Sequence, residues 1–236
     1  MQITNAVVTG AASGIGRALA ARLRADGAHV TLADIDAAAL AVAAEELGAA
    51  SFPADVSDPG AMEALAAAVP DADFVCLNAG IVGRDLGAPW EVSPEDWERV
   101  FAVNVGGVVN GLRAFVPRLL AAERPGHVLI TASLAGLVTF AVGGAYAAAK
   151  HAVVALAEQT AQGLAGTPIG VTMLCPALVR TGMSPEGEDP ADIAAAALAA
   201  VGEGRFTVVP DGWGGAIERR AALLASGAQP EPPAPA

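Results

Sequence analysis

The chain has 236 residues, a length that suits one large domain with a sizeable hydrophobic core. Hydrophobic residues make up 54% of it and aromatic residues only 4%, so the core must consist mostly of Ala, Val and Leu. The 13 basic residues against 25 acidic ones leave a net charge of −12, which argues against nucleic acid, anionic membranes and acidic proteins as partners.

The cysteines and the N-terminus favour a cytoplasmic protein. Cys76 and Cys175 each lie in an apolar run and are predicted to be reduced core thiols. The N-terminus has no basic segment followed by an apolar stretch, so we expect no secretory signal. Residues 126–149 and 159–179 are uncharged runs long enough to span a membrane, but their internal Gly, Thr and Pro residues predict short elements joined by turns. We therefore expect a soluble protein without membrane association.

The N-terminal elements form a strand, a glycine-rich turn and a helix. A strand over residues 6–9 leads into Gly10-Ala-Ala-Ser-Gly14-Ile-Gly16, and residues 17–26 then repeat apolar positions at helical spacing. This arrangement places a pyrophosphate on the free amides of a helix N-terminus, although the glycine spacing differs from the general dinucleotide fingerprint. A second strand over 28–33 ends in Asp34, 18 residues after Gly16, where an acid can bind the adenine ribose. An ordinary loop residue is the alternative for Asp34, and Asp36 is expected to be a helix cap.

The same alternation continues along the chain. It predicts strands over 49–54, 73–77, 127–132, 169–174 and 206–209, and helices over 37–47, from 57 onward, over 93–123 with a bend near Asn104, and over 146–164 and 190–201. Strands that alternate with helices predict an α/β fold, here a single Rossmann-type, doubly wound domain (residues 1–229) with about seven mostly parallel strands and helices on both faces. The Pro/Ala-rich residues 230–236 are expected to be a disordered tail.

Chemically useful residues occur where the predicted strands end. These are Gly10, Asp34, Asp55, Asn78, Ser133 and Pro176. Ligands of parallel α/β sheets bind at the carboxyl ends of the strands, so these residues are expected to meet at one edge.

Ser133, Tyr146 and Lys150 are the candidate catalytic residues. Tyr146 and Lys150 are four apart on a predicted helix and therefore share a face, while Ser133 arrives from a strand end. A nearby cation favours the phenolate and lowers the pKa of a tyrosine, which makes it a usable acid/base near neutral pH. Taken alone, the Tyr-x-x-x-Lys pattern is a weak signal, and a partly buried Tyr beside a solvated Lys is the alternative interpretation.

Together the motifs resemble those of the short-chain dehydrogenase/reductase family in its single-domain form. The matching pieces run in family order from residue 9 to residue 181: Thr9-Gly10-Ala-Ala-Ser-Gly14-Ile-Gly16, Asp55-Val56, Asn78-Ala79-Gly80, Asn104, Ser133, Tyr146-x-x-x-Lys150 and Cys175-Pro176 with Thr181. The resemblance implies a catalytic tetrad of Asn104, Ser133, Tyr146 and Lys150. It implies a nicotinamide cofactor held by Gly10, Ser13, Gly14, Ile15, Gly16, Asp34, Asp55, Val56, Asn78, Ala79, Gly80, Tyr146, Lys150, Pro176 and Thr181.

The resemblance also implies the roles within the tetrad. Tyr146 exchanges the alcohol proton, Ser133 orients the carbonyl oxygen, Lys150 holds the nicotinamide ribose, and Asn104 keeps a relay water in place. Three departures stand out: Pro176-Ala177 replaces the family's Pro-Gly, Leu77-Asn78 replaces its double Asn, and the segment after Thr181 is short.

Several other residues attract attention, and for some of them a structural and a functional role are both open. No histidine has metal-ligand spacing, so no metal site is expected, and His151 should point away from Lys150. Trp90 could line the pocket or lie on the surface, and Arg180 could be a solvated charge or a cofactor contact. The predicted pocket segments (residues 81–90, 134–144 and Met183) are mostly apolar and without a basic cluster.

The sequence therefore predicts an enzyme that transfers hydride between NAD(H) and an alcohol or ketone. Asp34, with no basic residue beside it, favours NAD over NADP. Two alternatives remain: a 3-oxoacyl thioester reductase and a non-catalytic NAD-binding scaffold or redox sensor. By resemblance, helices 104–123 and 146–164 pair with their copies in a homodimer or homotetramer. The short segment after Thr181 predicts an open pocket and broad acceptance of bulky apolar substrates, unless a second subunit or residues 213–224 cover it.

Overall fold

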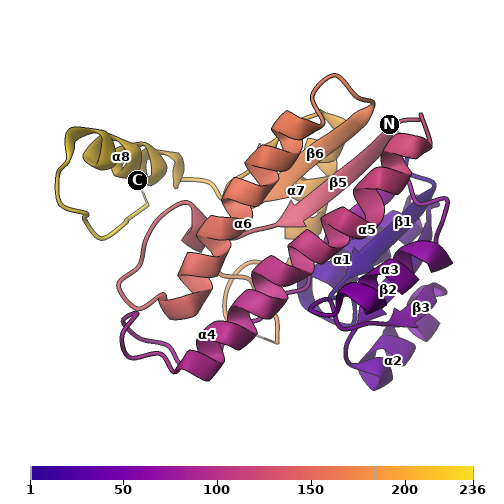
Figure 1. The fold of residues 1–236 in the computed structure, drawn as a ribbon, viewed down its shortest axis with the longest axis horizontal. Coiled ribbons are helices and arrows are strands. Elements are labelled where there is room, and N and C mark those ends of the chain that lie inside the picture. The colour runs from indigo at the N-terminus through magenta and orange to yellow at the C-terminus, as the bar shows by residue number, and fades with distance from the viewer. Residues whose placement is uncertain (1, 183, 236) are drawn as a thin grey trace.

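The fold is a parallel α/β sheet, as predicted. The computed structural model describes residues 2–182 and 184–235, and within them all strands join one seven-stranded sheet with the order β3-β2-β1-β4-β5-β6-β7. Every pair of neighbouring strands is parallel (Figure 1). The strands are β1 (Asn5–Thr9), β2 (His29–Asp34), β3 (Ala50–Pro53), β4 (Phe74–Leu77), β5 (Gly126–Thr131), β6 (Ile169–Leu174) and β7 (Thr207–Val208).

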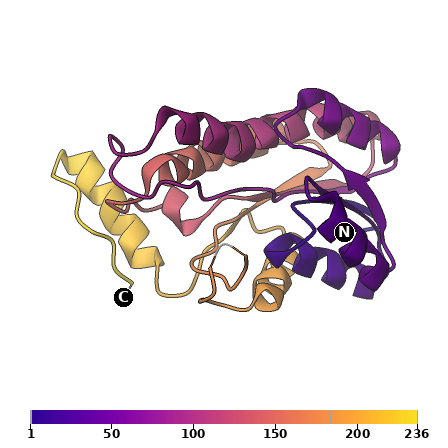
Figure 2. The same cartoon turned by 90° about the horizontal axis from the view of Figure 1, so that it is seen from below.

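Helices cover both faces of the sheet (Figure 2). Side chains of α1, α2 and α7 pack into one apolar cluster, and those of α3, α5 and α6 pack into another on the opposite face. The helices are α1 (Gly14–Ala25), α2 (Ala37–Leu47), α3 (Pro59–Ala68), α4 (Pro94–Phe101), α5 (Gly107–Ala121), α6 (Gly144–Gly163), α7 (Pro190–Gly202) and α8 (Gly214–Ser226). Helix α8 has no counterpart in the sequence prediction.

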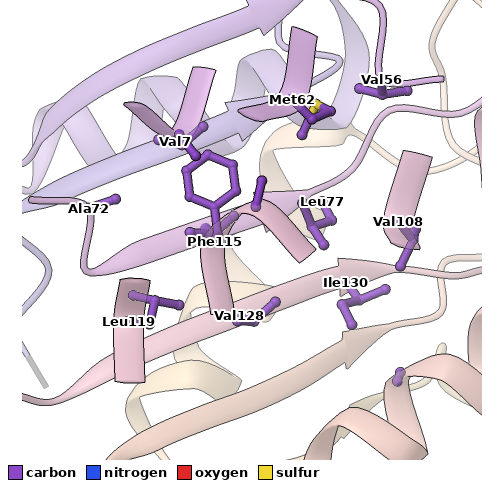
Figure 3. Packing of buried hydrophobic residues seen from close by; sticks show 14 of the residues in the cluster. Val7, Val56, Met62, Ala72, Leu77, Val108, Phe115, Leu119, Val128 and Ile130 are labelled. Carbon is purple, nitrogen blue, oxygen red and sulfur yellow. The ribbon is translucent and has the colours of Figure 1, made fainter. Parts of the chain in front are cut away.

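The core is built from small aliphatic residues around a few large ones, as the composition requires. Phe115 of α5 is fully buried and lies over β1 and β4, near Val7 and Leu77 (Figure 3). Gly111 allows the close approach of α5, because a Cβ at that position would collide with the Leu77 side chain. Burial of apolar area at roughly 25 cal/mol per Å² is what holds such helices on a sheet.

The helices begin where the sequence predicted caps. Asp36, Asp58, Ser93 and Asp189 each accept a hydrogen bond from a backbone N–H in the first turn of the helix that follows. Pro59, Pro94 and Pro190 occupy the first turn, where the missing N–H costs nothing.

Near Asn104, where a bend was predicted, the structure has a turn of π-helix, η1 (Ala102–Gly106), between α4 and α5, and the bend itself stays a prediction. By length and composition alone, the continuous helical run Pro94–Ala121 could cross a membrane. Its buried side chains, among them Val108, Phe115 and Leu119, instead pack in the core of the α/β domain. The two uncharged runs noted in the sequence resolve into strands β5 and β6 with parts of α6 and its flanking turns, as predicted.

Candidate active site

One large cleft lies at the carboxyl edge of the sheet and collects almost all the predicted site residues. Its volume is about 1020 Å³, at the top of the roughly 300–1,000 Å³ range of ligand pockets. The predicted residues that line it are Gly10, Ser13, Gly14, Ile15, Asp34, Asp55, Val56, Asn78, Ala79, Gly80, Ser133, Tyr146, Lys150, Pro176 and Thr181. Gly16 and Asn104 are buried behind the lining.

The glycine turn is shaped by close backbone approach. Gly10 has φ of +65°, and a Cβ there would lie 2.8 Å from the Cα of Ala79. A Cβ at Gly16 would collide with the carbonyl oxygen of Gly10. Ser13, the N-cap of α1, makes no side-chain capping hydrogen bond, so the first N–H groups of α1 remain available to an anion. The residues present therefore fit a dinucleotide pyrophosphate.

Asp34 is held firmly at the end of β2. Its Oδ2 accepts a hydrogen bond from the N–H of Ala12 in the glycine turn (3.0 Å), and its Oδ1 accepts one from the N–H of Asp36 (3.1 Å). The carboxylate thus joins the turn to the second strand while it lines the cleft. This placement fits recognition of ribose hydroxyls.

Asn78 joins three strands beneath the cleft. Its side-chain amide donates to the carbonyl oxygen of Thr9 (3.0 Å), and its Oδ1 accepts from the hydroxyl of Thr131 (3.1 Å). The backbone N–H groups of Asn78 and Ala79 donate to the Thr9 hydroxyl oxygen. A single Asn therefore suffices to support the floor, without the second Asn of the family pattern.

Asn104 lies within the π-turn and is only 1% exposed. Its Oδ1 accepts from the N–H of Ile81 and its Nδ2 donates to the carbonyl oxygen of Ile81, both at 2.8 Å. The side chain thereby fixes the segment that follows Gly80 and does not line the cleft.

Ser133, Tyr146 and Lys150 meet as predicted. The Lys150 ammonium donates to the carbonyl oxygen of Thr131 (3.0 Å) and lies 5.7 Å from the centre of the Tyr146 ring. The Ser133 oxygen accepts from the N–H of Ala135 (3.1 Å), which leaves its proton for another partner. Lys150 is 4% exposed, and burial lowers its pKa from 10.5 to about 8, an effect that Cys175 partly opposes.

The balance at Tyr146 differs from the sequence prediction. Burial raises the pKa of Tyr146 above its ordinary value of 10, and a hydrogen bond with Ser133 lowers it by less. The expected lowering by Lys150 is therefore wrong for this structure. The physical reason is desolvation, which penalises the charged phenolate more than the hydrogen bond with Ser133 favours it.

One residue next to α8 lines the cleft. Trp213, just before α8, and Phe140 both line the cleft, with ring centres 6.3 Å apart in an edge-to-face arrangement. Among the described residues around the short segment after Thr181, isolated bridges join Thr181 to Ser184 and Val179 to Glu188. Trp213 is the one member of residues 213–224 that lines the cleft, so the open pocket stays a prediction. Met183 lies outside the described residues, and Trp90 is 85% exposed and does not line the cleft.

A buried carboxylate that the sequence analysis missed organises the rim. Asp96 is 4% exposed and its Oδ2 accepts from the N–H groups of Arg84 (2.7 Å) and Asp85 (3.0 Å). Its Oδ1 accepts from Arg99, whose side chain lines the cleft. These hydrogen bonds hold the pKa of Asp96 below its ordinary value. The Ser93-Pro-Glu-Asp96 pattern revealed only a helix start.

Other residues singled out in the sequence have partners away from the cleft. His151 bonds the carbonyl oxygen of Ala147 in its own helix, and Arg180 pairs with Asp189 at the surface. Cys76 and Cys175 are free and buried, as predicted. Across residues 2–182 and 184–235, no group of His, Cys, Asp or Glu residues could hold a metal ion.

The fold and the cleft define a nucleotide-binding α/β protein with a Ser, Tyr and Lys group at the strand ends. The family model described as short chain dehydrogenase matches residues 4–191. The chain therefore belongs to the short-chain dehydrogenase/reductase family of oxidoreductases.

Individual relatives agree with this assignment. The chain is 46% identical over 194 residues to 1-deoxy-11-beta-hydroxypentalenate dehydrogenase of Streptomyces avermitilis, covering 78% of this chain and 72% of that protein. It is 35% identical over 190 residues to 2-(R)-hydroxypropyl-CoM dehydrogenase of Xanthobacter autotrophicus, covering 76% of each. A short-chain dehydrogenase/reductase from Burkholderia phymatum, solved in complex with NAD, superposes with a TM-score of 0.91 at 32% identity and covers 99% of this chain and 98% of that one.

Proposed function

We propose that this protein is an NAD-dependent dehydrogenase that interconverts a secondary alcohol and its ketone, with Tyr146 as the acid/base. The observation that carries the proposal is the meeting of Ser133, Tyr146 and Lys150 in the same cleft as the glycine turn. The bound coenzyme would supply the hydride acceptor or donor. The side chains of this protein would supply proton transfer, orientation and binding.

Tyr146 gives its proton to the ketone oxygen in reduction and removes the alcohol proton in oxidation. Ser133 donates a hydrogen bond to the same oxygen, since its hydroxyl proton is not used by the bond that its oxygen accepts from Ala135. Lys150 contributes a cation behind the phenol and binds the ribose hydroxyls of the coenzyme. Because burial raises the pKa of Tyr146, the phenol keeps its proton at neutral pH, and the rate of alcohol oxidation should rise with pH.

The coenzyme is NAD in this proposal because Asp34 stands where a 2′-phosphate would meet a like charge. The fixed position of the carboxylate, bonded to Ala12 and Asp36, supports this. The relative from Burkholderia phymatum, solved with NAD, supports it as well. The dehydrogenases from Streptomyces and Xanthobacter have hydroxylated compounds in their names, which fits an alcohol as the substrate.

Two alternatives from the sequence analysis are less well supported. A 3-oxoacyl thioester reductase served by an acidic carrier protein needs a basic docking face, and the net charge of −12 disfavours one. A non-catalytic scaffold has no use for Tyr146 and Lys150 in one pocket. A cytoplasmic location and a two-fold homo-oligomer remain part of the proposal.

The Tyr146→Phe variant tests the proposal. It should lose most turnover, on the order of 10²–10⁴-fold, because a positioned general acid is removed. It should still bind NADH with unchanged affinity, measured by nicotinamide fluorescence. Turnover near that of the parent protein would show that Tyr146 is not the acid/base.

Tyr146 is also the single tyrosine of the chain, so the ultraviolet absorbance of phenolate reports its titration without interference. The midpoint should lie above the ordinary value, and a midpoint below it would contradict the effect of burial on its pKa.

A further inference from the structure

The C-terminal helix has an unusual position for a surface helix. It lies beyond the arrowhead of β5, next to the loop between β5 and α6, in both views of the ribbon (Figures 1 and 2). Ala216 is its single buried residue within Gly214–Ser226, and packs with Leu134 and Val138. Ala177, Trp213 and Ile217 complete this small cluster. The helix is therefore anchored to the residues that directly follow Ser133 and Pro176.

This anchoring brings an aromatic pair to the cleft. Trp213 and Phe140 both line it and contact each other edge to face at 6.3 Å. Neither ring is buried: Phe140 is 36% exposed and Trp213 is partly exposed. An edge-to-face pair in the wall of a cavity offers flat apolar surface to whatever enters it.

We propose that Trp213 and Phe140 form a subsite for an uncharged apolar ring of the substrate. This rests on the proposed function, because the subsite adjoins Ser133 and Tyr146 through Leu134 and Ala177. An aromatic or alicyclic ring stacks on such a wall and loses little conformational freedom, whereas a flexible chain of equal size loses more.

The charge of the surroundings narrows the substrate class further. The described residues that line the cleft from segments 131–140 and 176–184, together with Trp213, carry no charged side chain. The two cations among the described residues that line the cleft are committed elsewhere: Lys150 donates to the Thr131 carbonyl and Arg99 pairs with Asp96. A carboxylate or phosphate placed beside Trp213 would lose its hydration without gaining a partner. The subsite therefore selects rings without charge.

Two ketones with the same number of carbons test the subsite: cyclohexyl methyl ketone and n-hexyl methyl ketone. The experiment compares kcat/KM for both with the parent protein, Trp213→Ala, Trp213→Phe and Phe140→Leu. Trp213→Ala should lower kcat/KM for the ring ketone roughly 10- to 100-fold and change the linear ketone by much less. Trp213→Phe should recover a large part of the loss. Leu224→Ala, an exposed position on the same helix, is the matched control and should change neither ketone.

Each outcome decides the matter. Equal losses for both ketones, or no loss for either, would overturn the subsite. A weaker affinity of Trp213→Ala for NADH would assign Trp213 to the coenzyme or to the fold and would also overturn it.

The proposed function and the subsite fail in different ways. Calorimetric titration of the Tyr146→Phe protein with cyclohexyl methyl ketone, with and without the Trp213→Ala change, measures binding without turnover. If the parent protein turned over no alcohol or ketone, but binding of the ring ketone depended on Trp213, the proposed dehydrogenase activity would be refuted and the subsite would stand. If the parent protein turned over alcohols or ketones, but binding of the ring ketone did not depend on Trp213, the subsite would be refuted and the dehydrogenase activity would stand.

Discussion

His127 should make the stability of the protein fall between about pH 6.5 and pH 4. Its ring is buried on β5, and its Nε2 lies 2.9 Å from the Thr172 hydroxyl. That hydroxyl donates to the carbonyl oxygen of Arg205 (2.7 Å), so it accepts from His127, whose Nε2 carries a proton. Burial is the largest cause that lowers the pKa of His127 from 6.5 to about 4.

The sign follows from the two states. As the pH falls below about 6.5, the unfolded chain binds a proton at His127 and the folded protein does not, so stability is lost until the folded pKa of about 4 is reached. A pKa difference of this size corresponds to roughly 3 kcal/mol in full. About 2 kcal/mol of it should be lost by pH 5.

Urea denaturation at about pH 7.5 and about pH 5, at one protein concentration, measures this loss. The parent protein should lose about 2 kcal/mol more free energy of unfolding between the two pH values than His127→Gln, whose amide can still donate to Thr172. His29→Gln, a change at an exposed position of β2, should behave like the parent. An equal loss in His127→Gln and the parent would refute the reasoning.

Three further results are expected. Asp34→Ala should raise the ratio of kcat/KM for NADPH to that for NADH roughly tenfold or more, because a like charge is removed; a parent protein that already prefers NADPH would contradict the role of Asp34. Asp96→Asn should raise KM for the ketone and lower the free energy of unfolding by roughly 1.5–3 kcal/mol, because the carboxylate holds the rim through the N–H groups of Arg84 and Asp85. The Kd for NADH should stay unchanged, and an unchanged KM for the ketone would contradict the role of Asp96. Sedimentation at micromolar concentration should give a dimer or tetramer, and a monomer would exclude pairing through α5 and α6.

The sequence predicted the fold and the strand-end residues because their signals are local. Gly10, Asp34, Asn78 and Ser133 each follow a short apolar run, and a parallel sheet places such positions at one edge by geometry. The cap residues were predictable for the same reason, since a cap bonds to N–H groups two or three residues away.

The contacts that were missed join residues far apart in the chain. Asp96 resembles an ordinary first-turn acid, and nothing in the pattern reveals its bonds to the N–H groups of Arg84 and Asp85. The pKa of Tyr146 was predicted in the wrong direction because helical spacing gives the distance to Lys150, whereas burial depends on the whole fold. Helix α8 also went unpredicted, and Ala216 is the single residue that it buries within Gly214–Ser226.

The π-turn at Ala102–Gly106 sets how this helix tolerates changes of length. A π-turn holds one residue more than a regular turn, and it lets α4 and α5 follow one axis with their faces out of phase by that residue. A deletion of one residue here would restore a regular helix and rotate one half against the other by about 100°. Asn104 would then lose its hydrogen bonds to Ile81, or Asp96 would lose its hydrogen bonds at the rim, although both side chains were still present. Single substitutions at the surface of this segment should therefore be tolerated where insertions and deletions are not.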